Sequence, residues 1–195
     1  MTPPELKSLL EALASGDDNR AEEAALALGQ LGDALLPDLR ALLPSDNIDI
    51  RWWATRALGE IGSEPAIALL LEQCGDPDHD VRVCAIYALG AFGERSASAV
   101  PTLLRCLADA SVYVGRMAAD ALARIGSAAT PGLIDRLKNG SSSVRGRAAR
   151  ALAQIADPTS IPALIAALED ENPIVEYYAD SALQKMGVGM VLLKI

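Results

Sequence analysis

The chain has 195 residues, of which 51% are hydrophobic and only 4% are aromatic. A core must therefore be built from Ala, Leu, Ile and Val, and this favours packed helices over a β-sandwich, because strands prefer β-branched and aromatic residues. The net charge of −9 argues against binding along a nucleic-acid backbone, which requires a basic surface.

The three cysteines, Cys74, Cys84 and Cys106, lack the Cys-x-x-Cys spacing of a metal or redox site. Their odd number and their spacing predict reduced thiols rather than disulfide bonds. The N-terminus has no basic region followed by an apolar run, and every apolar run is shorter than a membrane span. We therefore expect a soluble, cytoplasmic protein that does not bind membranes.

In chain order, residues 4–14 predict a leading helix, and one pattern then returns along the chain. Its Ala-Leu pair has the leucine at positions 28, 58, 89, 122, 152 and 183, so the intervals are 30, 31, 33, 30 and 31 residues. Such a period is typical of repeat architectures. The repeats are predicted to start near residues 17, 46, 76, 110, 141 and 171.

Between these copies lies a second recurring segment, such as EPAIALLLEQCGD or ASAVPTLLRCLAD. Most copies have a Pro near the start, which suits the first turn of a helix, and each ends in residues that cap or break helices. Each repeat therefore predicts two helices that bury their apolar faces only by stacking on neighbours. The sequence predicts an all-α fold, an α-solenoid of about five to six helix pairs, as one domain over residues 1–195. The apolar tail 188–195 is expected to cover the last pair or to form an oligomer contact.

The recurring pattern V-R-x-x-A-x-x-A-L-G-x-I-G, followed by x-x-x-x-P-x-L, resembles the short HEAT-like repeat named after phycobilisome (bilin) lyases. The resemblance covers nearly the whole chain. It implies stacked helix pairs in which the V-R helix lines a concave wall. It does not imply one function, because scaffolds, lyase subunits, a hydroxylase and inhibitor-like adaptors share this repeat.

The side chains of the V-R helix separate into two faces when its first residue is numbered zero. Positions 0, 4, 8 and 11 are apolar in nearly every copy and fall on one stripe of a helix, which predicts the core. Positions 2, 3, 6 and 10 fall on the opposite side, and they include the adjacent Trp52 and Trp53. On the implied concave wall these positions predict one binding groove. Its predicted residues are Trp52, Trp53, Arg56, Tyr87, Tyr113, Arg116, Met117, Arg147, Arg150, Tyr177 and Tyr178.

The charges of the predicted groove change along the chain. Glu22 and Glu23 occupy these positions in the first copy, whereas Arg residues occupy them in the later copies. This favours a partner with acidic or phosphorylated character near Arg147 and Arg150. The alternatives are that each Trp packs on a neighbouring helix and that the charges form a solvated face.

The Arg at position 1 has a different expected role, because it recurs beside the core at Arg51, Arg82 and Arg145. We interpret it as structural, paired with an acid in an inter-repeat turn. Candidate acids are Asp49, Asp80 and Asp109.

The sequence contains little catalytic chemistry. His79 is the one histidine, and its place in DPDHDVR before a helix favours helix capping by the acids over a metal site. The hydroxylase branch of the resembled repeats holds iron with repeated His-Glu pairs, which this sequence does not contain. We therefore predict no catalytic residues, no metal and no cofactor.

The predicted function is a non-catalytic scaffold or adaptor that binds another protein or a peptide. The alternative is a subunit of a bilin (tetrapyrrole) lyase or another chromophore-handling protein, in which aromatics stack on the pigment and Arg pairs with its propionates. DNA recognition along a HEAT-like groove is a third hypothesis, which the net charge of −9 disfavours.

Overall fold

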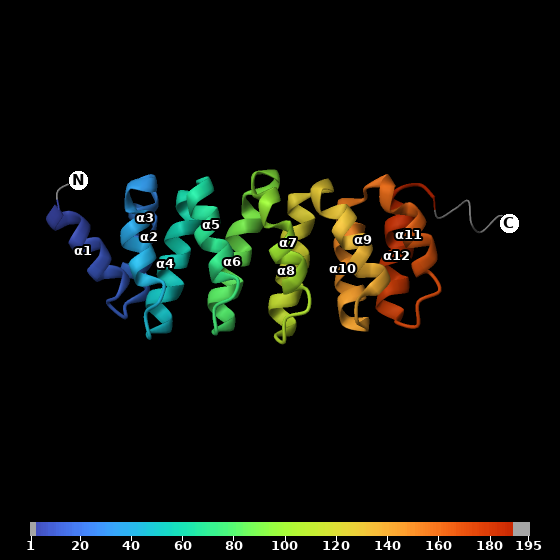
Figure 1. The fold of residues 1–195 in the computed structure, drawn as a ribbon, viewed down its shortest axis with the longest axis horizontal. Helices are drawn as coiled ribbons and strands as arrows, with labels where there is room; N and C mark the ends of the chain where they lie inside the picture. Colours follow the sequence, from blue (N-terminus) through green and yellow to red (C-terminus); the bar gives the residue numbers. More distant parts are fainter. Residues whose placement is uncertain (1–2, 189–195) are drawn as a thin grey trace. The chain divides into compact units, whose positions relative to one another are not determined.

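The computed structural model describes residues 3–188, and within this range it is built from twelve α-helices and contains no strand (Figure 1). The predicted all-α solenoid class is confirmed. The chain divides into two compact units, Met1–Leu89 and Gly90–Ile195. Each unit is a stack of helix pairs and is described by itself.

The N-terminal unit begins with α1 (Pro3–Leu13) and α2 (Asp18–Gly29), followed by a 3₁₀ turn (Gly32–Leu35). Next come α3 (Leu36–Leu42), α4 (Ile48–Ile61), α5 (Glu64–Gln73) and α6 (His79–Ala91), whose last residues belong to the second unit. In this unit α4 packs against α2, α3 and α5, and α1 packs against α2 and α4.

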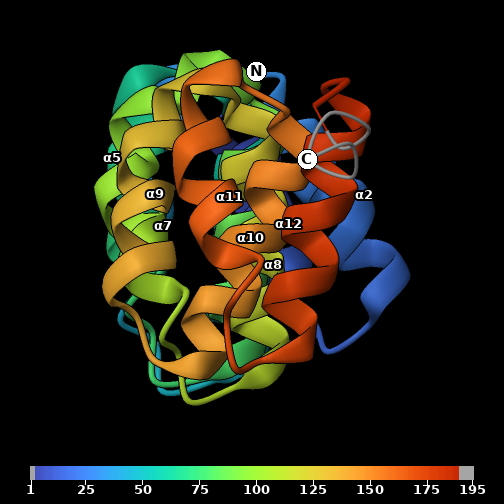
Figure 2. The same ribbon diagram turned by 90° about the vertical axis from the view of Figure 1, so that its right-hand side faces the viewer.

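The C-terminal unit contains six further helices in two layers. The helices are α7 (Val100–Cys106), α8 (Val112–Ile125), α9 (Thr130–Asn139), α10 (Ser142–Ile155), α11 (Ile161–Ala167) and α12 (Pro173–Lys185). One layer holds α7, α9 and α11, and the other holds α8, α10 and α12, with α10 between its two neighbours (Figure 2). Short 3₁₀ turns, Gly93–Ala99, Ser127–Ala129 and Pro158–Ser160, lead from one layer into the other.

Local sequence explains where the helices begin and end. Asn47 caps α4, since its side chain accepts a hydrogen bond of 2.8 Å from the backbone N–H of Asp49. The helix ends at Gly62, whose φ of 59° is a left-handed conformation that glycine adopts without steric cost. The helices α2, α4, α6, α8, α10 and α12 begin one to three residues after the predicted repeat starts.

Most of the predicted core stripe is buried, but position 11 is only half-buried at Ile61, Phe92, Ile155 and Met186, because it lies at the end of the helix. Positions 0, 4 and 8 of the second helix of each pair are fully covered in the C-terminal unit, where they pack against the first helix of the pair. These buried residues are Val114, Ala118, Leu122, Val144, Ala148, Leu152, Val175, Ala179 and Leu183.

Small residues at position 9 allow successive V-R helices to approach closely. A Cβ added to Gly59 of α4 would lie 3.0 Å from the Cβ of Ala88, and one added to Gly90 would lie 2.9 Å from the backbone Cα of Ala121. Only hydrogen fits in these positions without moving a neighbour. At Gly59 and Gly90 the glycine of the Ala-Leu-Gly pattern is therefore required by the close packing of neighbouring residues.

The sequence also gave rise to one prediction about the C-terminal tail and one about membranes. The apolar tail 188–195 lies, apart from Val188, outside the described residues. Within residues 3–188, no helix combines the length and the apolar character needed to cross a bilayer.

Candidate functional site

The two tryptophans of α4 do not share the same environment. Trp53 is only 9% exposed and Trp52 is half-buried, with the two rings in an edge-to-face contact whose centroids lie 4.6 Å apart. The prediction that both lie outside the core is therefore wrong for Trp53. The physical reason is that α1 and the turn after it cover the side of α4 on which Trp53 lies.

Position 3 generally faces the preceding repeat rather than solvent. Cys84 occupies it in α6, where its Sγ lies 4.0 Å from the backbone oxygen of Trp52 in α4. Burial raises the pKa of the Cys84 thiol to about 12, so this thiol stays protonated at neutral pH and is a poor nucleophile. The sequence predicted position 3 on the outer face because the angular positions of residues on one isolated helix do not show where the neighbouring helix lies.

Exposed candidates in the N-terminal unit are fewer than predicted. Tyr87 of α6 is 55% exposed, while Arg56 of α4 is half-buried and forms an ion pair with Glu60 one turn later. The unit therefore presents Tyr87 and part of Trp52, with the charge of Arg56 already compensated.

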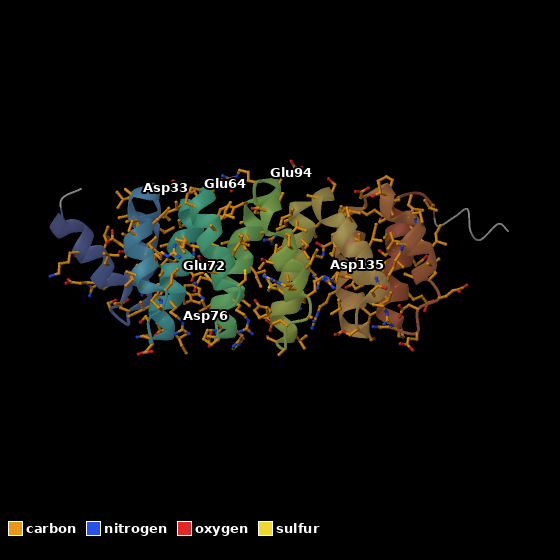
Figure 3. All side chains as sticks on the ribbon, in the orientation of Figure 1. Asp33, Glu64, Glu72, Asp76, Glu94 and Asp135 are labelled. Carbon is orange, nitrogen blue, oxygen red and sulfur yellow. The ribbon has the colours of Figure 1, made fainter. Side chains whose placement is uncertain are left out.

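At Arg51 and Arg145, the Arg at position 1 forms the structural pair expected of it, with acids other than Asp49 and Asp80. Arg51 binds both carboxylate oxygens of Asp76, at 2.8 and 3.0 Å, and donates a third hydrogen bond to the backbone oxygen of Ser45. Asp76, labelled in Figure 3, lies in the turn before α6. Since Arg51 and Asp76 are both 8% exposed, the pair fixes two successive turns to each other.

The C-terminal unit repeats this arrangement. Arg145 binds the two carboxylate oxygens of Asp170 at 2.7 and 2.9 Å and the backbone oxygen of Gly140 at 3.3 Å. The hydrogen bonds from Arg145 hold the pKa of the Asp170 carboxyl below its usual range. The suggested partners Asp49 and Asp80 are replaced by acids 25 residues after each Arg.

Two Arg residues of the predicted basic region already have partners. Arg147 lies across α8, where an added Cβ on Gly115 would be 2.5 Å from its Cζ, and it donates a hydrogen bond to the backbone oxygen of Leu107. Arg150 pairs with Asp120 of α8 at 2.8 Å. These contacts contradict the prediction that the two side chains are free to select an acidic partner.

Arg116 of α8 differs from these residues. It is exposed, and within residues 3–188 it forms no ion pair or side-chain hydrogen bond. Arg116 is therefore the predicted cation of the C-terminal unit that is available to a partner.

Exposed aromatic and aliphatic side chains of the described C-terminal unit occur on α8, which carries Arg116, and on α12, the two neighbours of α10. Tyr113 is 49% and Tyr177 66% exposed, whereas Tyr178 and Met117 are half-buried. Between them on α10 are the exposed Ser143, the buried Gly146 and the half-buried Arg147. We call this surface the α8–α12 face. It comprises Val112, Tyr113 and Arg116 of α8, Ser143 and Gly146 of α10, and Ile174 and Tyr177 of α12.

Contacts between first turns hold this face together. The side-chain amide of Asn172, before α12, donates hydrogen bonds to Ser142 of α10, at 3.0 Å to its backbone oxygen and 2.9 Å to its Oγ. A Cβ on Gly146 would lie 3.4 Å from the Cγ2 of Ile174. The sequence analysis missed Val112 and Ile174 because they precede position zero, although isolated apolar residues in a polar turn were a usable signal.

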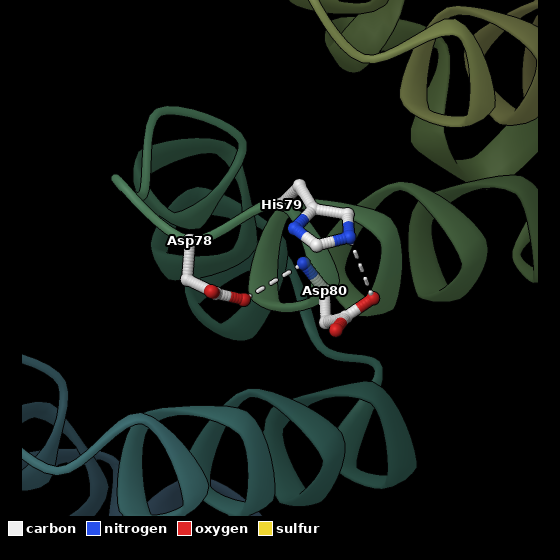
Figure 4. Close-up of side chains that lie close together, drawn as sticks. All are labelled: Asp78, His79 and Asp80. Atoms are coloured by element: carbon white, nitrogen blue, oxygen red, sulfur yellow. Dashed lines mark hydrogen bonds and ion pairs between the residues drawn. The ribbon is translucent and has the colours of Figure 1, made fainter.

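One group of potential metal ligands occurs among the described residues, formed by Asp78, His79 and Asp80 (Figure 4). Asp78 is engaged in capping, since its Oδ1 accepts hydrogen bonds from the backbone N–H groups of Asp80 and Val81, and His79 lies 3.5 Å from Asp80. Both His79 and Asp80 are exposed. The geometry agrees with the predicted capping role.

Comparison with known proteins defines the class. The family described as HEAT repeats matches residues 6–83, 67–131 and 130–189. Deoxyhypusine hydroxylase-B of Oryza sativa subsp. japonica is 31% identical over 210 aligned positions, covering 91% of this chain and 70% of that protein. The chain belongs to the HEAT-repeat family, in the branch that includes deoxyhypusine hydroxylase.

Solved structures agree with this fold. The complex of CpcE and CpcF of phycocyanin lyase from Nostoc sp. PCC7120 matches with 22% identity and a TM-score of 0.61, over 77% of this chain and 99% of that chain. A designed armadillo repeat protein in complex with the peptide (KR)4 matches with 23% identity and a TM-score of 0.53, over 93% and 99%. Identities this low show the fold alone. The predicted resemblance to the lyase-type HEAT-like repeat is confirmed.

The hydroxylase relative contradicts the functional predictions. The interpretation as a non-catalytic scaffold or adaptor, and with it the expectation of no catalytic residues, is wrong against an enzyme that is 31% identical over most of the chain. The error arose because the absence of one ligand motif was given more weight than similarity along the whole repeat array.

The residues present nevertheless do not fit an iron centre built from repeated His-Glu pairs. The full sequence contains a single histidine, His79, and it is followed by Asp80 rather than Glu. That histidine is the exposed first residue of α6. No step through a metal is therefore derived for these residues.

Proposed function

We propose that this chain binds a segment of another protein on its α8–α12 face, and that this binding serves hydroxylation of a side chain in that segment. The 31% identical hydroxylase supports the reaction class. The observation that carries the binding role is the exposure of Tyr113 and Tyr177 on either side of the small residues of α10. Exposed aromatics next to an Arg are typical of binding hot spots.

The shape of the face supports an extended or helical peptide. Ser143 is exposed on α10, which packs between α8 and α12, so a partner side chain there would lie between Tyr113 on one side and Tyr177 on the other. Tyrosine supplies a large contact area with few rotatable bonds, which limits the entropic cost of binding. A designed repeat protein of the same fold has been solved with a bound peptide.

Arg116 favours a partner with a negative charge near this side chain. Because this guanidinium has no ion pair within residues 3–188, an Asp or Glu in the partner would pair with it without breaking an existing contact. The partner is therefore proposed to be acidic near Arg116. Nucleic acid is disfavoured by the net charge of −9, and three buried free cysteines support a cytoplasmic location.

The other predicted binding residues stay predictions. Trp52, Arg56 and Tyr87 belong to the N-terminal unit, and contact between them and a partner is untested. The single-domain boundary 1–195 is likewise a prediction.

Peptide binding tests the proposal. A fluorescent peptide with a central deoxyhypusine residue flanked by Asp and Glu is titrated with the chain, and affinity is read from fluorescence polarisation. Tyr113→Ser combined with Tyr177→Ser should weaken binding about tenfold or more, because both aromatic contacts are lost. Ile165→Ser on α11, where Ile165 is 38% exposed, is the matched control and should leave binding unchanged.

A second variant tests whether the charge of Arg116 contributes to peptide binding. Arg116→Gln should weaken binding of the acidic peptide and have little effect on a peptide in which the flanking acids are Asn and Gln. Equal affinity of the wild type and the double Tyr variant would reject the α8–α12 face as the binding surface.

A further inference from the structure

The two compact units of the chain differ strongly in charge. Residues 1–89 hold 16 acidic and 6 basic side chains, a net charge of −10, whereas residues 90–195 hold 10 acidic and 11 basic side chains, a net charge of +1. A contact between the N-terminal units of two copies would bring like charges together. Electrostatics therefore favours a contact in which the N-terminal unit of one copy meets the C-terminal unit of another.

One side of α2 is a free acidic surface of the N-terminal unit. Glu22, Glu23 and Leu26 are exposed there, although α2 packs against α1 and α4 through its other residues. Spacings of three and four residues place Leu26 on the same side of the helix as the two acids. Within residues 3–188 neither carboxylate has a hydrogen bond or an ion pair. This side of α2 therefore presents an apolar side chain beside two uncompensated negative charges.

The α8–α12 face has the complementary character. None of the residues that define this face is acidic, and Arg116 has no ion pair among the described residues. Arg116 follows Tyr113 by three residues, so the cation and the aromatic ring lie on the same side of α8. An acid and an apolar residue with the same spacing on another helix could therefore contact both.

We propose that α2 of one copy binds the α8–α12 face of a second copy of this chain. Glu22 and Glu23 pair with Arg116, and Leu26 packs against the exposed tyrosine rings. The contact joins two different surfaces, so it repeats from copy to copy and forms open chains unless the rotation closes a ring. The inference goes beyond the proposed function, because it requires no other protein.

Sedimentation velocity of the full chain at low ionic strength tests the proposal. The sedimentation coefficient of the wild type should rise with protein concentration and fall when sodium chloride is added. Arg116→Glu alters one surface, and Glu22→Lys combined with Glu23→Lys alters the other. Each of these two proteins should self-associate about tenfold or more weakly than the wild type, because opposite charges become like charges.

Mixing the two altered proteins tests whether the contact joins two different surfaces. The Arg116→Glu protein keeps its α2 surface, and the double Lys protein keeps its α8–α12 face. An equimolar mixture should therefore form a 1:1 complex that grows no further. A chain with all three substitutions should self-associate again, since its charges are exchanged rather than lost.

The matched control changes the same amount of charge elsewhere in the N-terminal unit. Asp33 and Glu64 are exposed acids outside α2 (Figure 3). Asp33→Lys combined with Glu64→Lys should weaken self-association far less than the substitutions on α2. Circular dichroism checks that each variant keeps its helix content.

Three results would overturn the proposal: a wild type that stays monomeric at low salt, a mixture that forms no 1:1 complex, or an equal loss in the control variant. A monomeric wild type that still binds the acidic peptide would reject the second copy and leave the proposed function in place. Self-association without peptide binding would support the second copy and reject the proposed function.

Discussion

At the scale of single residues, Ala156 has a strained backbone conformation. It ends α10 with a φ of 54° and is the one described residue other than glycine with positive φ. Gly62 holds the corresponding place after α4, and a left-handed conformation costs an L-residue about 1–2 kcal/mol. Five of the six aligned repeats place glycine here, and this one does not.

Replacing Ala156 by Gly should therefore raise the free energy of unfolding. We expect a gain of about 1 kcal/mol, part of which is offset by the greater freedom of glycine in the unfolded chain. Urea denaturation of the variant and the wild type measures this change in the free energy of unfolding. Ala153→Gly in the interior of the same helix should destabilise by about 1 kcal/mol, and if both variants changed stability in the same direction, the strain at Ala156 would not be real.

The pair between Arg145 and Asp170 predicts a dependence of stability on pH. Hydrogen bonds from Arg145 lower the pKa of Asp170 in the folded state. A lowered carboxyl pKa contributes stability above the unfolded-state pKa of about 3.9, and this contribution is lost as pH falls through the folded-state value.

Asp170→Asn should therefore lower the melting temperature at neutral pH, and the difference from wild type should shrink as pH falls below about 4. Melting curves over a series of pH values test this. Glu169→Gln, which changes an exposed neighbour, is the control. A difference that stayed constant into strong acid would show that the ion pair is not its source.

At the scale of elements, the spacing between neighbouring V-R helices depends on glycine residues at position 9. Gly90 lies so close to α8 that a methyl group would meet the backbone of Ala121 at 2.9 Å. Backbone atoms cannot rotate away as a side chain does. Gly90 and the backbone of Ala121 would have to move apart, which disturbs the packing around them.

Gly90→Ala should therefore destabilise the protein by about 1–3 kcal/mol, even though Ala favours helices more than Gly does. Gly146→Ala is the matched control, because its new Cβ meets the Ile174 side chain at 3.4 Å and nothing closer. There the helix preference should prevail and stability should increase by about 0.5–1 kcal/mol. Chemical denaturation of both variants gives the comparison, and a stabilised Gly90→Ala protein would contradict the account.

At the scale of the whole molecule, the repeat pattern changes in its last described helix. Positions 1 and 9 face the next repeat in the earlier copies, as the contacts of Arg51 with Asp76 and of Gly59 with Ala88 show. In α12 these positions hold Glu176 and Gln184, and both are exposed. A polar outer face is typical of a repeat that closes a stack.

The repeat period made the fold predictable from the sequence, but the site was only partly predictable. Positions 0, 4 and 8 are buried as the apolar pattern predicts, because a helix face is a local property. The environment of Trp53 depends on α1, and the contacts of Arg147 depend on the glycine at position 115 of α8. These are relations between repeats, which the periodicity of one helix does not contain.

Photo-crosslinking tests the central claim most directly, namely that a protein segment binds to the α8–α12 face. A photoreactive phenylalanine replaces Tyr113, Tyr177 or, as a control in the other layer, Ile165, and each protein is irradiated with the acidic deoxyhypusine peptide. Crosslinked product from the first two proteins and little from the third is the predicted result. Equal or greater crosslinking at Ile165, or none at either tyrosine position, would contradict the account.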